Sequence, residues 1–506
     1  MLPIFSSANI KAWDQYTIEN EPIESIELME RASKVIFDWL TLRLNLDSKI
    51  YIICGSGNNG GDGLCVARLL YQEAYLVNVY CLNLSGNISP EFQNSYDRLV
   101  AGGFNHFLTE SEFLEGIQNS SGIILDALLG SGINRAIGPE LYFLTQQINQ
   151  SKNIKISIDL PSGMFAMPPW DGICIEADFT LSLQSPKLTA LLPDTGPFYG
   201  HLEVLEIGLS QGFVENISTA FHWLERRDIL DRLKERQPFD YKNKFGHVLV
   251  IGGANGMAGA TLFAARSALR GGCGLCSILS LEENRSVFQT ALPEAMFLTP
   301  DVGLVKTYKC IAMGPGMGAE QTLINILHEV LSKSETNLVI DADGLNAITS
   351  EEQLGLNFNN KILTPHIGEF DRLFGGSATH YERLSKARSK AIQFNCFIVL
   401  KGHFTAIVNP SGNVLFNSTG NSSLAKGGSG DVLCGLISAF VAQSYELEDA
   451  CILGVYLHGL AADLYVMENG MESLLASDLI EVLPKVFKLL WDEKKAGSSV
   501  WSRNQC

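Results

Sequence analysis

The most informative stretch of the C-terminal half is Gly427-Gly-Ser-Gly-Asp431, which is followed by the apolar run Val432-Leu-Cys-Gly-Leu-Ile437. This pattern predicts a glycine turn that leads into an apolar helix. A glycine-rich turn at the start of a helix exposes backbone N–H groups and the positive end of the helix dipole, and both attract phosphate groups. Asp431 stands at the same turn, where its carboxylate could take a proton from a hydroxyl group that attacks a phosphoryl group. A tight turn with a carboxylate that serves the helix dipole is the structural alternative. The combination with Asp431 and with a Lys401-Gly402 strand end upstream favours a phosphoryl-transfer site.

Short β-branched segments alternate with helical segments along the whole chain, which is typical of an α/β fold with a parallel sheet between helices. We expect strands at 50–54, 122–126 and 154–159 in the first half, and at 247–251, 337–341, 361–364 and 397–401 in the second. In open α/β sheets the ligand binds beyond the carboxyl ends of the strands. Polar residues at these ends are therefore the candidate site residues.

Two domains are expected, because 506 residues exceed the length of a typical single domain. Residues 223–230 have the pattern of a new amphipathic helix, and the strand at 247–251 has its own glycine turn at 252–256. We therefore place one domain at 1–220 and the other at 221–495.

The chain is acidic and rich in apolar residues. It has 55 Asp plus Glu against 37 Lys plus Arg, a net charge of −18, and 46% of its residues are hydrophobic while 18% are charged. The low charged fraction predicts large buried cores. The negative charge argues against nucleic acid or an anionic membrane as a partner, because both require a basic face. Any phosphorylated ligand must then be held by backbone amides, helix dipoles and a metal ion.

The eleven cysteines are scattered along the chain, as in reduced cytosolic proteins, and do not suggest a disulfide framework. Cys273 and Cys276 have a C-x-x-C spacing but no second Cys or His pair nearby, which argues against zinc. Residues 1–9 lack the basic and apolar regions of a signal peptide. No apolar run approaches the ~18 residues of a membrane span. We expect a soluble, cytoplasmic protein.

Three strand ends of the first half carry glycine turns and polar residues. Gly55-Ser-Gly-Asn-Asn-Gly-Gly-Asp-Gly63 follows the first strand and opens a helix, so its backbone can approach a diphosphate closely. Asp126 leads into a second turn at Gly130-Ser-Gly-Ile-Asn-Arg135, and Asp159-Leu-Pro-Ser-Gly163 ends the third strand. The first loop does not have the G-x-G-x-x-G spacing of the dinucleotide fingerprint.

Asn59, Asp126 and Ser162 supply oxygen donors at these three strand ends, without thiolate or imidazole. Such ligands suit a hard cation. Each residue alone could instead cap a helix or shape a turn, but their shared position at strand ends favours a metal site.

Together these motifs resemble the NAD(P)H-hydrate epimerase family, whose members interconvert the two epimers of NAD(P)H that has gained water across its nicotinamide ring. The resemblance implies a Rossmann-like three-layer sandwich, with potassium held by Asn59, Asp126 and Ser162. It implies catalytic roles for Asp159, which would face the hydrated ring, and for Lys187, although a surface lysine after a proline is the alternative there. The nucleotide would be held by Asn58, Asn59, Gly60, Gly61 and Asp62 in the first loop, and by Gly130, Ser131, Gly132, Ile133, Asn134, Arg135 and Ala136 in the second.

The second half resembles the NAD(P)H-hydrate dehydratase family, a branch of the ribokinase-like kinases. The ordered motifs are Gly252-Gly253 with Gly259-Ala260, Met313-Gly-Pro-Gly-Met-Gly318, Asp341-Ala-Asp-Gly-Leu-Asn346, Leu363-Thr-Pro-His-Ile-Gly-Glu369, Lys401-Gly402 and Gly427-Gly-Ser-Gly-Asp431. The resemblance implies that Asp431 is the catalytic base. The other implied site residues are Gly428, Ser429 and Gly430 for the phosphoryl group, Lys401, Gly402, His403, Phe404 and Thr405 for the nucleotide donor, and Ala260, Gly318 and His366 for the hydrate pocket.

Two histidines of this half have structural alternatives. His366 could belong to a turn with a capped imidazole, and His458 lies in a run of small residues that favours a packed core histidine.

The fusion of the two halves is characteristic of the bifunctional NAD(P)H-hydrate repair enzymes. The resemblance implies that transfer of a phosphoryl group from ADP, with Mg²⁺, to the ring hydroxyl makes phosphate the leaving group, whose elimination restores NAD(P)H. The expected ligands are hydrated NADH, hydrated NADPH and ADP, and we expect a homo-oligomer.

Two other functions remain open from the sequence. A ribokinase-like vitamin or sugar kinase with an N-terminal nucleotide-binding module would share the turn at Asp431, but it gives no reason for an epimerase-like first half. Alternatively, the first half could sense nucleotides or act as a scaffold without catalysis. The joint presence of Asn59, Asp126 and Asp159 speaks against this second alternative.

Overall fold

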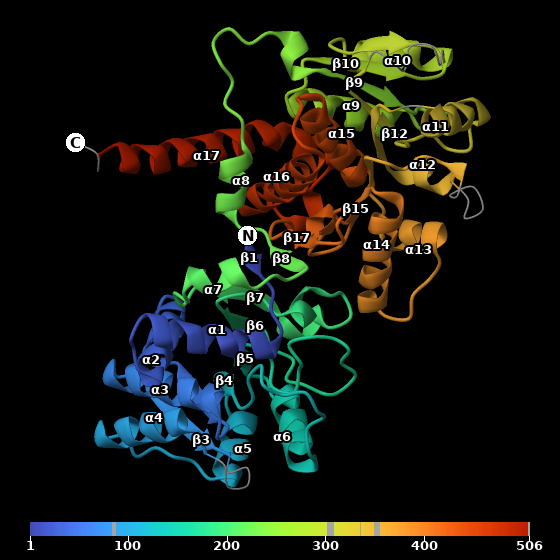
Figure 1. Cartoon of the computed structure of the whole chain (residues 1–506). Coiled ribbons are helices and arrows are strands. Elements are labelled where there is room, and N and C mark those ends of the chain that lie inside the picture. The colour runs from blue at the N-terminus through green and yellow to red at the C-terminus, as the bar shows by residue number, and fades with distance from the viewer. Residues whose placement is uncertain (83–87, 301–307, 334, 349–354, 504–506) are drawn as a thin grey trace. The chain divides into compact units, whose positions relative to one another are not determined.

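The computed structural model describes residues 1–82, 88–300, 308–333, 335–348 and 355–503 (Figure 1). The chain divides into two compact units. One is Leu2–Phe221, and the other comprises Met1 and His222–Cys506.

The N-terminal unit is built around a parallel sheet with the order β3-β2-β4-β5-β6-β7. The strands of this sheet are β2 (Lys49–Cys54), β3 (Leu76–Cys81), β4 (Ile123–Ala127), β5 (Ile154–Ile158), β6 (Phe179–Leu183) and β7 (His201–Leu205), and the short strand β1 (Leu2–Pro3) is not part of it. Its helices are α1 (Ser7–Asn20), α2 (Ser25–Thr41), α3 (Asn58–Gln72), α4 (Pro90–Ala101), α5 (Glu110–Asn119), α6 (Pro139–Gln150) and α7 (Gln211–Asn216), with 3-10 turns at Leu188–Leu191 and Gly196–Tyr199.

Alternate residues of the central strands pack on opposite faces of this sheet. Ile50 and Ile52 of β2 join a core with α2, α3 and α4, whereas Tyr51 and Ile53 join a second core with α5 and α6. This alternation follows from the two-residue period of a strand. The unit is therefore a three-layer α/β/α sandwich, as the sequence predicts.

Helix α1 is fixed to this unit by its own small core. Trp13 stacks on Phe213 of α7 with ring centroids 6.1 Å apart, and its indole N–H donates to the carbonyl of Ser210 at 2.8 Å. The hydroxyl of Thr17 accepts a hydrogen bond from the backbone N–H of Ser210 at 3.0 Å. These contacts hold one face of α1 against the chain that follows β7.

The C-terminal unit contains a mixed sheet with the order β8-β17-β16-β15-β14-β13-β12-β9-β10-β11. The strands from β15 to β11 pair in parallel, while β16 and β17 form an antiparallel extension. The strands are β8 (Phe221–Trp223), β9 (His247–Ile251), β10 (Leu275–Leu279), β11 (Met296–Leu298), β12 (Cys310–Met313), β13 (Asn337–Ile340), β14 (Lys361–Leu363), β15 (Phe397–Leu400), β16 (Ala406–Val408) and β17 (Val414–Phe416).

Helices α9, α15, α16 and α17 gather on one side of this sheet (Figure 1) and share one large apolar core with it. The helices of the unit are α8 (Arg226–Arg232), α9 (Ala258–Arg270), α10 (Arg285–Ala291), α11 (Gln321–Lys333), α12 (Ala342–Asn346), α13 (Ile367–Phe374), α14 (His380–Phe394), α15 (Ser429–Ala442), α16 (Leu447–Glu468) and α17 (Ala476–Arg503). Its 3-10 turns are Lys242–Phe245, Glu282–Asn284, Ser422–Leu424 and Met471–Ser473.

Helix α16 corrects one expectation from the sequence, because it is long and apolar enough to meet the length and composition criteria for a membrane span. Every residue from Ala450 to Ala462 in it is buried. Burial on all sides explains its apolar composition without a membrane.

The predicted strands all appear within one residue of their expected ends, but the helix predicted at 223–230 begins later. Trp223 ends strand β8 instead, and α8 starts at Arg226. The backbone N–H of Leu224 donates to the carbonyl of Phe416, which continues the pairing of β8 with β17 and explains the later start.

Candidate functional site

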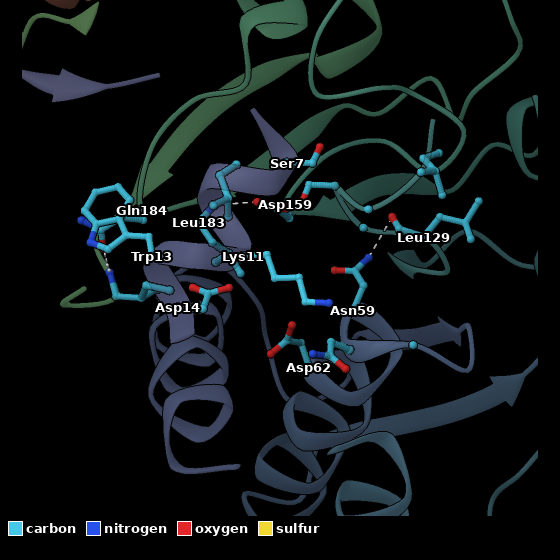
Figure 2. A pocket seen from close by; sticks show the side chains of 18 of the residues that line it. Ser7, Lys11, Trp13, Asp14, Asn59, Asp62, Leu129, Asp159, Leu183 and Gln184 are labelled. Carbon is cyan, nitrogen blue, oxygen red and sulfur yellow. Dashed lines mark hydrogen bonds between the residues drawn. The ribbon is translucent and has the colours of Figure 1, made fainter. Parts of the chain in front are cut away.

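A cavity of about 510 Å³ opens at the carboxyl ends of strands β2, β4, β5 and β6 of the N-terminal unit (Figure 2). It is lined by the first glycine loop, the second glycine loop, helix α1 and the chain after β6 and β7. The lining residues are Ser7, Ile10, Lys11, Trp13, Asp14, Ser56, Gly57, Asn58, Asn59, Asp62, Leu128, Leu129, Gly130, Ser131, Gly132, Ile133, Asp159, Leu183, Gln184, Ser185, Ile207 and Leu209.

The first glycine loop passes very close to neighbouring backbone, and this explains its composition. A Cβ atom on Gly55 would lie 2.0 Å from the carbonyl oxygen of Leu128, and one on Gly60 would lie 1.8 Å from that of Gly55. Helix α3 begins within this segment at Asn58, with Gly57 as its N-cap residue, so that Gly60 lies in the first turn of the helix. The free N–H groups at this helix start therefore lie at the cavity, where they can bind an anion.

Behind the loop, Asp126 is fully buried and organises two strand ends. Its carboxylate accepts hydrogen bonds from the Ser162 hydroxyl at 2.5 Å, the Ser162 N–H at 2.9 Å, the Ser157 hydroxyl at 2.8 Å and the Leu128 N–H at 3.2 Å. Burial raises the pKa of Asp126 above its usual value, against the lowering effect of these hydrogen bonds.

Two of the three predicted metal ligands, Asn59 and Ser162, contact one carbonyl group, and the third, Asp126, is bonded to Ser162. The Asn59 side-chain amide donates to the carbonyl of Leu129 at 3.1 Å, and the Ser162 hydroxyl lies 3.3 Å from the same oxygen. Asp126 contacts Ser162 directly. No group of three or more His, Cys, Asp or Glu side chains within the described residues could hold a metal ion. A cation here would therefore depend on amide, hydroxyl and carbonyl oxygens.

Asp159 and Lys187 form a buried ion pair at the end of β5. The ammonium group of Lys187 also donates to the carbonyls of Leu183 and Ser185, at 3.3 and 3.1 Å. Lys187 is 0% exposed, so the alternative of a surface lysine is wrong. The backbone of Asp159 has a φ of +70°, a strained conformation that non-glycine residues adopt mainly where a site requires it.

Helix α1 brings two charged residues to this cavity that the sequence does not single out. Figure 2 shows Lys11, Asp14 and Asp62 around the same space as Asp159 and Asn59. Burial raises the pKa of Asp14 to about 7, assisted by the negative charge of Asp159 and opposed by the positive charge of Lys187. Burial also raises the pKa of Asp62, and the charges of Asp159 and Asp14 raise it further.

Not every predicted nucleotide-binding residue of this half lines the cavity. Asn58, Asn59, Asp62, Gly130, Ser131, Gly132 and Ile133 do, whereas Gly60, Gly61, Asn134, Arg135 and Ala136 do not. Gly60 and Gly61 are buried in the first turn of α3, where they shape the loop and leave ligand contact to their neighbours.

A second cavity, of about 460 Å³, lies in the C-terminal unit near the ends of β14 and β15 and the start of α15. It is lined by most of the residues predicted to hold the nucleotide donor and the phosphoryl group. The lining residues are His366, Lys401, Gly402, His403, Thr405, Asn417, Thr419, Gly420, Asn421, Ser422, Leu424, Ala425, Ser429, Gly430, Leu433, Val455, His458 and Gly459.

Lys401 joins two buried carboxylates beside this cavity. Its ammonium group lies 2.7 Å from Oδ1 of Asp341, at the end of β13, and 3.7 Å from Oε2 of Glu369 in α13. Burial pulls the pKa of Lys401 down, but the charges of Asp341 and Glu369 outweigh burial and raise it. The sequence motifs contain both acids, yet neither is predicted as a site residue.

Asp431 occupies the third position of α15, next to this cluster. Burial raises its pKa to about 7, and the negative charge of Asp341 adds to the effect while Lys401 opposes it. Gly428 precedes the helix with a φ of +94°, a conformation that favours glycine, and turns the first N–H groups of α15 toward the cavity side. The turn therefore presents an anion-binding helix start and a carboxylate together.

The two histidines with structural alternatives both have structural contacts. The imidazole of His366 caps α13, where Nδ1 accepts from the N–H groups of Gly368 and Glu369 at 3.0 and 3.3 Å. Nε2 of His458 donates to the carbonyl of Ser429 at 2.9 Å, and burial lowers the pKa of His458 to about 4. Both residues nevertheless line the second cavity.

Five predicted residues of this half lie outside the lining of that cavity, namely Ala260, Gly318, Phe404, Gly428 and Asp431. Ala260 is in α9, where its Cβ would lie 3.1 Å from a Cβ on Gly316, and the N–H of Gly318 donates to Asp343 at 2.9 Å. Phe404 packs edge-on against Trp223, with ring centroids 5.3 Å apart. Phe404 therefore contacts the protein core in this structure.

Comparison with known protein families assigns each half separately. Residues 248–485 match the family described as NAD(P)H-hydrate dehydratase, and residues 25–189 match the family described as YjeF-related protein N-terminus.

Relatives extend over nearly the whole chain. A bifunctional NAD(P)H-hydrate repair enzyme of Coxiella burnetii is 33% identical, covering 95% of this chain and 98% of its own, and one of Moorella thermoacetica is 30% identical, covering 97% of both. The solved structure of a ribokinase-like superfamily protein of Enterococcus faecalis is 27% identical with a TM-score of 0.50, and covers 54% of this chain and 98% of its own. The chain therefore belongs to the family of bifunctional NAD(P)H-hydrate repair enzymes.

Proposed function

We propose that the N-terminal unit interconverts the R and S epimers of hydrated NAD(P)H, and that the C-terminal unit dehydrates the S epimer at the expense of ADP, giving AMP and phosphate. The observation that carries this proposal is that each unit has its own cavity with its own Lys–Asp ion pair at the carboxyl ends of parallel strands. A fused protein needs two such sites only if it performs two reactions.

In the C-terminal unit, Asp431 takes the proton from the ring hydroxyl as that oxygen attacks the phosphoryl group. A base works best when its pKa lies near the working pH, and the pKa of Asp431 is raised to about 7. The N–H groups at the start of α15 stabilise the charge of the transferring phosphoryl group. Phosphate then leaves with the C–O electrons, while the neighbouring ring carbon loses a proton to solvent and its C–H electrons form the C=C bond. Lys401, held by Asp341, adds a fixed positive charge at the same place.

In the N-terminal unit, the glycine loops hold the nucleotide and the Asp159–Lys187 pair faces the hydrated ring. Burial from water keeps this pair in one geometry, since Lys187 has three carbonyl or hydroxyl acceptors besides the carboxylate. The start of α3 at the same cavity suits the diphosphate of the nucleotide, and Asp159 lies on another side of the lining.

Asn59, Asp126 and Ser162 fit a potassium ion, because their donor atoms are all oxygens once the Asn59 amide presents its oxygen. The bound ion would supply a fixed positive charge near the nucleotide. Magnesium in the other unit would be held mainly by the nucleotide phosphates, because Asp341 and Glu369 are already engaged by Lys401. In both sites the ion would add a positive charge to the contacts that the protein residues make with the nucleotide.

The proposal is tested with a mixture of epimers of chemically hydrated NADH, Mg²⁺, K⁺ and either ADP or ATP, followed by the absorbance of the reduced nicotinamide. We expect complete recovery with ADP. A stable phosphate ester without recovery would instead identify a vitamin or sugar kinase. Cytoplasmic location fits these substrates, and fractionation of cells that express the chain would check it.

A second experiment separates the two activities. A fragment of residues 1–220 should epimerise the hydrates, whereas a fragment of residues 221–506 should consume the S epimer and then slow down. Mixing the fragments should restore full recovery. Equal consumption of both epimers by the second fragment alone would contradict the division of labour.

A further inference from the structure

We propose that Asp14 is a catalytic acid–base residue of the N-terminal site, and that it exchanges a proton with the hydroxyl group on the hydrated ring carbon. The inference rests on the proposed epimerisation. It names a residue of α1, a helix that ends at Asn20, well before the first glycine loop begins at Gly55, and that contributes none of the predicted site residues.

The position of Asp14 is the first argument. It lines the same cavity as Asp159 and the first glycine loop, and Figure 2 shows its carboxyl group facing the space between α1 and α3. Its carboxyl group has no hydrogen bond or ion pair recorded with any described residue, unlike Asp126 and Asp159, which are held by several donors. A polar group in a cavity without a protein partner is free to bond to a ligand.

Helix α1, which carries Asp14, is held in place by contacts on both sides of this residue. Asp14 directly follows Trp13, whose indole is fixed by Phe213 and by the carbonyl of Ser210. Thr17, one turn later, is bonded to the backbone of Ser210 as well. The carboxyl group of Asp14 is therefore presented from an anchored helix, as proton transfer requires.

The charges around Asp14 are the third argument. Asp159 favours the neutral form of Asp14, and Lys187, already paired with Asp159, favours the charged form. Asp62 and Lys11 line the same cavity. Burial and Asp159 dominate, and together they bring the pKa of Asp14 to about 7. Both protonation states are then accessible near neutral pH, which suits a group that must give and recover a proton.

The epimers interconvert by loss of water from the hydrated ring carbon and its return to the opposite face. The Asp14 carboxylic acid protonates the hydroxyl oxygen while the C–O bond breaks, the lone pair of the ring nitrogen forms a C=N bond, and water leaves. Water then adds to the other face of the same carbon, the C=N electrons return to nitrogen, the added water gives one proton to solvent, and the Asp14 carboxylate recovers a proton from solvent. No oxidant or second substrate is consumed, and the product differs only in configuration.

The test uses the full-length protein and its Asp14→Asn variant, which keeps the shape of the side chain. Purified S-hydrated NADPH is incubated in H₂¹⁸O without ADP, and the appearance of the R epimer and of ¹⁸O in it is followed by chromatography and mass spectrometry. We expect the turnover number to fall ~10²–10⁴-fold, with loss of the wild-type decline in rate above a pH of about 7. Dehydration of the S epimer with ADP, measured on the same sample, should stay at the wild-type level.

Glu19→Gln, an exposed carboxylate change on the same helix, is the matched control and should leave both activities unchanged. A loss of less than tenfold in Asp14→Asn with the pH dependence retained would overturn the role of Asp14. Epimerisation by the wild type without ¹⁸O in the R product would overturn the step as written. If the wild-type protein does not epimerise at all, the proposed function itself fails, and the two failures are thus distinguishable.

Discussion

The two halves of this protein arrange the same three charged groups in different surroundings. Each places a lysine against a buried aspartate at a strand end, the buried Lys187 with Asp159 and the half-buried Lys401 with Asp341. Each then adds a further aspartate whose pKa burial raises to about 7, Asp14 in one half and Asp431 in the other.

The difference lies in what surrounds that further aspartate. Asp431 is the third residue of its helix, beside free backbone N–H groups that attract phosphate, whereas Asp14 lies in the middle of α1. Asp14 faces other carboxylates, Asp62 and Asp159, which do not attract an anion. A lysine–aspartate pair is thus common to both halves, and what differs is the position of the further acid on its helix.

The largest effect should come from Asp431→Asn, which removes the base but keeps the helix start. Dehydration should fall ~10²–10⁴-fold, because an amide cannot accept the proton. ADP binding, measured by calorimetry, and epimerisation should be unchanged. Glu382→Gln, at the same third position of exposed α14, is the matched control and should keep full dehydration. A loss of dehydration activity below tenfold in Asp431→Asn would show that Asp431 is not the base.

Dehydration should also respond to pH in a defined direction. Asp431 acts as a base only when ionised, and its pKa is raised to about 7. The turnover number should therefore fall as the pH drops below about 7, and the fall should be absent from the residual activity of Asp431→Asn. A rate independent of pH between 6 and 8 in the wild type would show that another group takes the proton.

A change at Lys187 tests how much the buried Lys187–Asp159 ion pair contributes to the stability of the N-terminal unit. Lys187→Met leaves Asp159 buried without a counter-charge, and removal of one partner of a buried pair typically costs about 3–5 kcal/mol. Chemical denaturation of the full chain should show that the N-terminal unit loses stability while the C-terminal unit keeps its midpoint. Lys34→Met, an exposed lysine on α2, should change the stability by no more than about 0.5 kcal/mol.

The first glycine loop offers a sharper pair of variants. Gly60→Ala would place a Cβ 1.8 Å from the carbonyl oxygen of Gly55, whereas Gly57→Ala meets no heavy atom within 4 Å. We expect the first change to destabilise the N-terminal unit by about 1–3 kcal/mol and the second to have little effect on the melting temperature. Equal melting temperatures would mean that the loop can move away without cost.

The smallest expected effect separates the halves by their ions. Epimerisation should be several-fold faster with K⁺ than with a bulky organic cation, because the proposed ligands Asn59, Asp126 and Ser162 offer oxygen atoms that a bulky organic cation cannot approach closely. Dehydration by the same sample, with Mg²⁺ constant, supplies the internal control. Identical epimerisation rates in both salts would remove the potassium site.

The fold could be read from the sequence because its signals are local. Strand β9, with its glycine turn, is recognisable from a few consecutive residues, and so is the start of α15 at Asp431. Asp14 could not be found in this way, since it is a single acid in an ordinary helix and reaches the cavity only through the packing of Trp13. Likewise, the pairing of Lys401 with Asp341 joins residues 60 positions apart, and no spacing rule connects them.

The distribution of thiols described above has a practical consequence for kinetics. The described cysteines are all free, and all but Cys81 are buried; Cys54, Cys65 and Cys174 belong to one unit, and Cys273, Cys276, Cys310, Cys396, Cys434 and Cys451 to the other. A thiol reagent can reach a buried sulfur only when the surrounding structure opens. The rate of alkylation at each cysteine, measured by peptide mass spectrometry, would therefore report the rate at which the structure around that cysteine opens. Slower labelling of only one set on addition of a nucleotide would identify the unit that the nucleotide holds closed.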